Sequence, residues 1–131
     1  MEKIHNFLKE AGTFIVTTVD GDQPKARPFG YQALEDGKVL FGVGDYKDCY
    51  KQLQANPKVE ILAVKPDMTW LRYTGTAVFE TDPKYAEHAL ETMPELKAIY
   101  TPESGKKMAM FHLENAHAVI IKVMNVVETL L

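Results

Sequence analysis

Three cationic side chains lie close together around one predicted helix. Lys47 and Lys51 are four residues apart, so they share one face of the helix expected to open at Gly44 and Asp45. Arg27 lies on the strand predicted just before it. Free amides at a helix N-terminus and converging Lys and Arg side chains suit a phosphate group. Each cation alone is more typical of a solvated surface, but the combination favours an anion site.

The elements that must position these cations are two strands and the helix. Lys25–Leu34 alternates like a strand, Asp36-Gly37 is a strong hairpin signal, and Val39–Val43 is the returning strand. The helix ends at Asn56-Pro57, because proline cannot continue a helix. Its apolar positions follow helical spacing and are Tyr46, Cys49, Tyr50 and Leu53.

The rest of the chain is rich in strands. Met1–Gly12 and Tyr85–Met93 are predicted helices, and a short helical turn follows from Pro94 through Tyr100. Gly75, within the long strand Thr69–Glu80, indicates a bulge. The other predicted strands are Thr13–Val19, Val59–Val64, Met108–Leu113 and Ala118–Val127, with a hinge between the last two at Glu114-Asn115. We expect one domain, 1–131, of the mainly β, α+β class: a small barrel with helical decoration.

Composition excludes several classes of function. The net charge is −3 and no long basic run occurs, so neither nucleic acid nor an anionic membrane is an expected partner. No apolar run is long enough to span a bilayer, and the single cysteine suits a reducing compartment. We therefore expect a cytoplasmic protein.

Other chemical motifs are weak. The four histidines lack metal-ligand spacing, so no metal site is expected. No nucleophile elbow occurs, and Gly42-Val43-Gly44 lacks the context of a dinucleotide fingerprint. Cys49 is expected to be a small buried residue. Catalytic acid–base residues are not identifiable.

Three segments carry a resemblance to a known family. TFIVTTVDGDQPKARPFGY, DGKVLFGVGDYKDCYKQLQANPKVEI and WLRYTGTAVFETD are similar to the FMN-binding split-barrel family that includes pyridoxamine 5′-phosphate oxidase. The closer likeness is to its small, single-domain members, including the nitroimidazole-resistance type. It extends from about Ile4 to Met124 and is strongest in Gly21–Pro28, Leu53–Pro57 and Trp70–Gly75.

The resemblance implies a six-stranded antiparallel split barrel that forms homodimers, with FMN in two grooves at the interface. Arg27, Lys47 and Lys51 would hold its phosphate or ribityl chain. Trp70 and Arg72 would reach the cofactor of the other subunit. The flavin ring would be lined by Pro28, Phe29, Gly30, Phe41, Gly42 and Val43, and Tyr50 is the tyrosine expected nearest to it.

Two departures from the family pattern concern the phosphate site and the activity. Cys49 stands where many relatives carry Lys, and Asp45 lies near the expected anion. The C-terminal segment that helps the true oxidases hold pyridoxal phosphate is absent, so that activity is not carried over.

The resemblance therefore implies an FMN-dependent oxidoreductase that passes electrons from a reduced nicotinamide, or another donor, to a small acceptor. One alternative is a non-catalytic module that binds flavin or haem, with His112 or His117 as the axial ligand. Another is a deazaflavin-dependent reductase on the same barrel.

Overall fold

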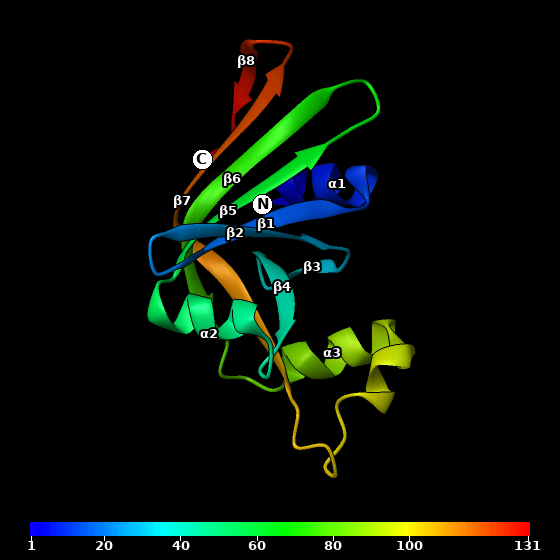
Figure 1. Cartoon of the computed structure of the whole chain (residues 1–131). Helices are drawn as coiled ribbons and strands as arrows, with labels where there is room; N and C mark the ends of the chain where they lie inside the picture. The colour runs from blue at the N-terminus through cyan, green and yellow to red at the C-terminus, as the bar shows by residue number, and fades with distance from the viewer.

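A computed structural model describes residues 1–131 of the chain. A single curled antiparallel sheet forms the body of the molecule (Figure 1). Its eight strands follow the order β2-β1-β5-β6-β7-β4-β3, and β8 pairs with β7. The mainly β class is confirmed, with more strands than the six expected. The bounds are β1 Phe14–Asp20, β2 Gln23–Phe29, β3 Gln32–Glu35, β4 Lys38–Gly44, β5 Lys58–Val64, β6 Thr69–Phe79, β7 Met108–Lys122 and β8 Asn125–Thr129.

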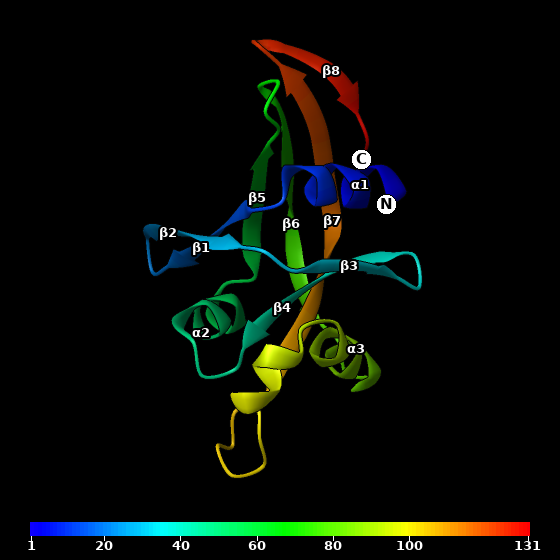
Figure 2. The ribbon, with the colours of Figure 1, turned by 90° about the vertical axis from the view of Figure 1, so that its right-hand side faces the viewer.

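The sheet is split where the chain passes from β2 to β3. These strands lie at opposite ends of the strand order although only Gly30 and Tyr31 separate them in sequence. Figure 2 shows the chain crossing from one edge to the other at this point. The prediction of one strand over Lys25–Leu34 is therefore wrong, because β2 pairs with β1 whereas β3 pairs with β4.

Backbone conformation explains the tight turns. Asp36 and Gly37 both have positive φ, 51° and 73°, as the favoured two-residue hairpin turn requires. Gly75 lies at a register shift between β6 and β7, where a Cβ would be 2.9 Å from the Glu114 carbonyl oxygen. The bulge is confirmed. The expected hinge at Glu114-Asn115 lies within one continuous strand, β7, in which Asn115 has a φ of 49°.

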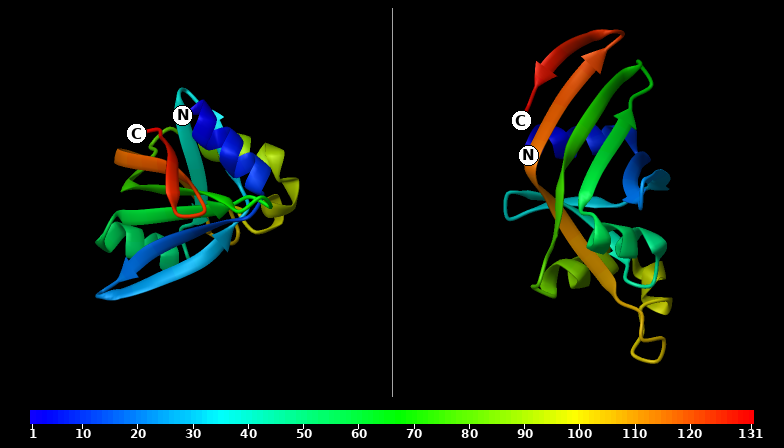
Figure 3. Two further views of the ribbon diagram at one scale, coloured as in Figure 1. Left: turned by 90° about the horizontal axis from the view of Figure 1, so that it is seen from above. Right: turned by 60° about the vertical axis from the view of Figure 1, so that its left-hand side comes forward.

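The helices are α1 Glu2–Ala11, α2 Asp48–Ala55, α3 Lys84–Thr92 and the 3-10 turn η1 Pro94–Ala98. They lie on both sides of strands β1, β2 and β3, with α1 above them and α2 and α3 below them in the views of Figures 1 and 2, and Figure 3 shows the same arrangement from other directions. α1 buries Ile4, Phe7 and Leu8 and is capped by Gly12, as expected. α2 begins later than predicted, since Lys47 is still extended, and Tyr46 lies outside the helix. No helix is long and apolar enough to cross a membrane.

Aromatic side chains fill the core behind the cation-bearing segments. Phe41 lies 5.6 Å from Phe14 and 5.5 Å from Phe111 between ring centroids, and all three are fully buried. Packing of this kind fixes β4 against β7 and the start of β1. The adjoining segments β2 and α2 are thereby held on a rigid base.

Candidate functional site

A cleft with a volume of about 770 Å³ opens between β2, the end of β4, the start of α2 and the segment around η1. This volume lies in the upper part of the range for ligand pockets, about 300–1,000 Å³. Seven of the predicted cofactor residues line it: Arg27, Pro28, Phe29, Gly30, Gly42, Val43 and Lys47. A smaller hollow of about 380 Å³ lies on β1, β5 and β6 and contains none of the predicted residues.

Arg27 is held in the cleft by uncharged partners. Its Nη1 donates to Thr18 Oγ1 at 2.7 Å and to the Val16 carbonyl at 3.2 Å, and its Nη2 donates to Gln52 Oε1 at 2.9 Å. Thr18 is itself fully buried and donates to the same Gln52 oxygen at 2.6 Å. The guanidinium therefore joins β1, β2 and α2 while its charge stays uncompensated by any carboxylate.

Positive electrostatics converge on the same end of the cleft from α2. Lys47 precedes the first helical residue, and no side chain caps the helix, so its first amides are free of a side-chain acceptor. The buried Cys49 thiol lies close enough to Arg27 and Lys47 for their positive charges to affect its pKa. Burial raises its pKa, whereas the charges of Arg27 and Lys47 oppose that rise. An anion would be favoured where these groups meet.

Asp45, one of the two departures from the family pattern, is engaged away from the cleft. Its carboxylate accepts a hydrogen bond from the Lys107 amide at 3.0 Å, and its own amide donates to the Lys107 carbonyl at 2.9 Å. These bonds fasten the 99–107 loop to the end of β4. Asp45 is not among the residues that line the cleft, although Asp48 is.

Another part of the cleft lining is apolar and phenolic. It is formed by Met93 and Leu96 of the η1 segment, by Met108, and by Tyr46 and Tyr100. The two tyrosine rings lie 6.3 Å apart between centroids. Burial, reinforced by the neighbouring Tyr46, raises the pKa of Tyr100 to about 12, so its hydroxyl stays protonated at neutral pH.

Bare glycine backbone makes room for these side chains. A Cβ at Gly44 would lie 2.6 Å from Tyr46 Cε1 and 2.7 Å from the Tyr100 hydroxyl. A Cβ at Gly42 would lie 2.9 Å from the Met108 sulfur. Any larger residue at either position would push the lining side chains out of place.

The remaining predicted residues lie outside the cleft. Phe41 is buried in the core behind it, and Tyr50 packs against Phe79 with ring centroids 5.1 Å apart. Lys51 is exposed on α2 and is not a lining residue. Trp70 and Arg72 lie on β6, where the guanidinium sits 5.0 Å from the Trp70 ring centroid, and neither residue lines the cleft.

Several lining residues were not foreseen. Gln52 follows Asp48, the first residue of α2, by four residues, so helical spacing places the two residues on one face of the helix. Tyr46 was expected within the helix. Met93, Leu96, Tyr100 and Met108 are distant in sequence, and no local pattern places them over β4.

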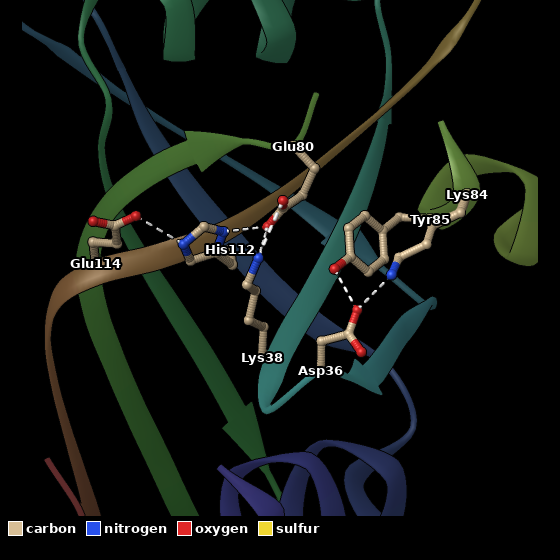
Figure 4. A network of polar contacts seen from close by, with 7 residues as sticks. All are labelled: Asp36, Lys38, Glu80, Lys84, Tyr85, His112 and Glu114. Atoms are coloured by element: carbon tan, nitrogen blue, oxygen red, sulfur yellow. Dashed lines mark hydrogen bonds and ion pairs between the residues drawn. The ribbon is translucent and has the colours of Figure 1, made fainter. Parts of the chain in front are cut away.

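A second polar cluster lies away from the cleft (Figure 4). Glu80 pairs with Lys38 Nζ at 3.2 Å and raises the pKa of Lys38. His112 Nδ1 lies 2.5 Å from Glu80 in an ion-pair contact that lacks hydrogen-bond angles, and its Nε2 lies 2.9 Å from Glu114. Both ring nitrogens of His112 thus face carboxylates.

The same cluster includes a smaller group around Asp36. Its carboxylate accepts a hydrogen bond from the Tyr85 hydroxyl and pairs with Lys84 Nζ at 2.9 Å (Figure 4). The Tyr85 hydrogen bond, with help from Lys84, lowers the pKa of Asp36. These contacts tie the β3–β4 hairpin to α3.

Comparison with known proteins identifies the family. The family profile described as pyridoxamine 5′-phosphate oxidase matches residues 1–122. A NimC/NimA family protein from Clostridium acetobutylicum is 34% identical, with a TM-score of 0.85 over 99% of this chain and 89% of that one. No curated protein matches the chain. The chain belongs to the pyridoxamine 5′-phosphate oxidase family.

More distant structures share the fold. HupZ from Group A Streptococcus is 20% identical, with a TM-score of 0.70 and 98% of each chain covered. General stress protein 26 from Bacillus anthracis is 18% identical, with a TM-score of 0.66 and 92% of each chain covered. At these identities the likeness establishes the architecture alone, the split barrel expected from the sequence.

Proposed function

We propose that the chain is an FMN-binding flavoprotein that passes electrons from a reduced nicotinamide, or another donor, to a small acceptor. The family commonly uses flavin, and the 34% identity to a NimC/NimA family protein supports a place among its small members. FMN would supply the redox chemistry when bound. The chain would supply position, charge and exclusion of water.

The observation that carries this proposal is the uncompensated charge of Arg27. A guanidinium oriented by three neutral acceptors retains its charge and loses little freedom when an anion binds. Lys47 and the uncapped start of α2 lie at the same end. These groups fit a phosphate monoester, and the adjoining backbone of Pro28, Phe29 and Gly30 would carry the ribityl chain and ring.

The predicted cofactor residues on β6 lie outside the cleft of their own chain and would contribute through a second subunit. We infer that the protein is a homodimer in which Trp70 and Arg72 reach the cofactor held by the other chain. Arg72 already stacks on Trp70 and pairs with Glu60 at 3.4 Å, so both side chains are ordered on the face of β6.

The absorption spectrum of the protein purified from cells tests the cofactor. We expect a flavin spectrum, and mass spectrometry of the molecule released by denaturant should identify FMN at about one per chain. Bleaching of that spectrum by NADH or NADPH, followed by recovery with an acceptor, would support turnover. A haem or deazaflavin spectrum would contradict the assignment. A haem ligated by histidine would need rearrangement, because His112 and His117 do not line the cleft.

A further inference from the structure

Gln52 uses one half of its carboxamide within the chain and leaves the other half free. Its Oε1 accepts hydrogen bonds from Arg27 Nη2 at 2.9 Å and from Thr18 Oγ1 at 2.6 Å. Its Nε2 has no hydrogen-bond partner, and solvent reaches it, because His112 Nδ1 is the only buried side-chain N or O atom that lacks one. An amide nitrogen carries two N–H donors. Since Gln52 lines the cleft, these donors are available to a ligand there.

The contacts with Arg27 and Thr18 fix which way the Gln52 carboxamide faces. A guanidinium has donors only, so Arg27 Nη2 requires the amide oxygen at this position. Arg27 Nη1 donates to Thr18 Oγ1 at 2.7 Å, and the Thr18 hydroxyl passes its own proton to the same amide oxygen. A reversed amide would set its N–H groups against the guanidinium. Thr18 is fully buried, so solvent does not compete for its hydroxyl.

Arg27 also retains free donors beside Gln52. A guanidinium has five N–H groups. Nη1 makes two contacts with the chain and Nη2 makes one, which leaves the Nε N–H and the second Nη2 N–H without an acceptor. Both lone pairs of Gln52 Oε1 are already used. All the hydrogen-bonding capacity that remains in this joined pair is therefore donating.

We propose that Gln52 is a further binding residue for the phosphate, with Nε2 donating to a phosphate oxygen beside Arg27, and that Thr18 is the residue that positions it. The proposal rests on the proposed function, because it assigns the FMN phosphate to the cationic end of the cleft, where Arg27, Lys47 and the start of α2 lie. A fully ionised phosphate group offers acceptors only, so a set of free donors fits it.

Two substitutions of Gln52 test the donor. Gln52→Glu keeps an acceptor for Arg27 and Thr18 but lacks the N–H groups and adds a negative charge, whereas Gln52→Met removes both halves of the amide. Gln52→Met should weaken FMN binding at least about tenfold, the usual effect of one hydrogen bond to a charged group, and Gln52→Glu should weaken it further. Riboflavin affinity should stay within about threefold of the wild type in both variants.

The matched control makes the same change elsewhere on the helix. Gln54 is exposed on α2 and does not line the cleft. Gln54→Glu should leave FMN affinity within about twofold of the wild type, because an exposed charge is screened by solvent. Flavin fluorescence titration measures all of these affinities.

Substitutions of Thr18 test the positioning role. Thr18→Val removes the hydroxyl that orients the Gln52 amide, and it should lower the ratio of FMN to riboflavin affinity about three- to tenfold. Thr18→Ser keeps the hydroxyl and should restore the ratio to within about twofold of the wild type. A purely structural role for Thr18 would lower the affinities for FMN and riboflavin alike and would leave their ratio unchanged.

Side-chain amide NMR separates this proposal from the proposed function. The Gln52 Nε2 signal, identified by its absence in Gln52→Glu, should shift when FMN is added and should not shift with riboflavin. An unmoved signal in the FMN complex, or an equal shift with riboflavin, would overturn the proposal. If the wild type binds no FMN, the proposed function fails, and inorganic phosphate then tests the donor alone. A shift with phosphate would support the Gln52 donor, and an unmoved signal would remove it.

Discussion

Arg27 in the cleft and Lys38 in the polar cluster are both half-buried cations, but their partners differ in charge. Arg27 donates only to neutral oxygens, whereas Lys38 faces the largely buried carboxylate of Glu80. A cation with a carboxylate partner is already neutralised and serves stability. A cation held by neutral groups keeps a positive charge that can attract an anionic ligand. The partners of a cation, more than its burial, thus distinguish the region proposed to bind the FMN phosphate from the region that serves stability.

The largest expected difference between the two regions concerns FMN affinity. Arg27→Ala should weaken FMN binding at least about 100-fold, or about 2.7 kcal/mol, because a charge-assisted bond to phosphate is lost. Lys38→Ala should leave FMN affinity within about twofold. Flavin fluorescence titration measures both. Since Arg27 also joins β1, β2 and α2, a thermal unfolding curve must show that the variant is folded, and Arg27→Lys should recover part of the affinity.

A finer comparison lies within the cationic region. Lys47 lines the cleft and Lys51 does not, although the sequence pattern predicts both as phosphate ligands. Lys47→Ala should therefore weaken FMN binding about tenfold and Lys51→Ala less than about twofold. The same titration provides the measurement. Equal losses would show that Lys51 also reaches the phosphate and would contradict the assignment of that role to Lys47 alone.

Local sequence signals predict some features of this fold and miss others. The hairpin at Asp36-Gly37, the bulge at Gly75 and the end of α2 at Asn56-Pro57 depend on local backbone preferences, and each was predictable. The break at Gly30-Tyr31 was not, because alternation continues across it while the pairing partner changes.

The candidate site likewise combines residues that the sequence could place with residues that it could not. Arg27 and Lys47 could be placed together because they flank one strand–turn–helix unit. The neutral partners of Arg27 come from two other elements, β1 and α2, so its lack of a carboxylate could not be read from spacing. Tyr100 and Met108 reach the cleft because the segment around η1 packs there and Asp45 fastens the 99–107 loop to the end of β4. No local sequence pattern predicts these long-range contacts.

In the polar cluster the expected effect is on stability. Glu80→Gln should lower the thermal unfolding midpoint by about 5 °C, because Lys38 and His112 would lose their shared carboxylate. FMN affinity should not change. Calorimetry of the two proteins side by side is the measurement, and an unaltered midpoint would contradict the structural role given to this cluster.

The smallest expected effect is a pH dependence at the exposed pair of His88 and Glu35. The Glu35 hydrogen bond raises the pKa of His88 above 6.5. The stabilisation is therefore fully present below that ordinary value and is lost as pH rises through the raised pKa. His88→Gln should lower the unfolding midpoint by about 1–2 °C at about pH 5.5 and by less at about pH 9. An equal loss at both values would show that the pair's charge does not matter.

The relative affinity for FMN and riboflavin tests the central claim most directly, because the two ligands differ only in the phosphate. The wild type should bind FMN at least about 100-fold more tightly than riboflavin, and Arg27→Ala should reduce that ratio to less than about tenfold. Equal affinity of the wild-type protein for the two flavins would contradict the assignment of the cationic end to phosphate.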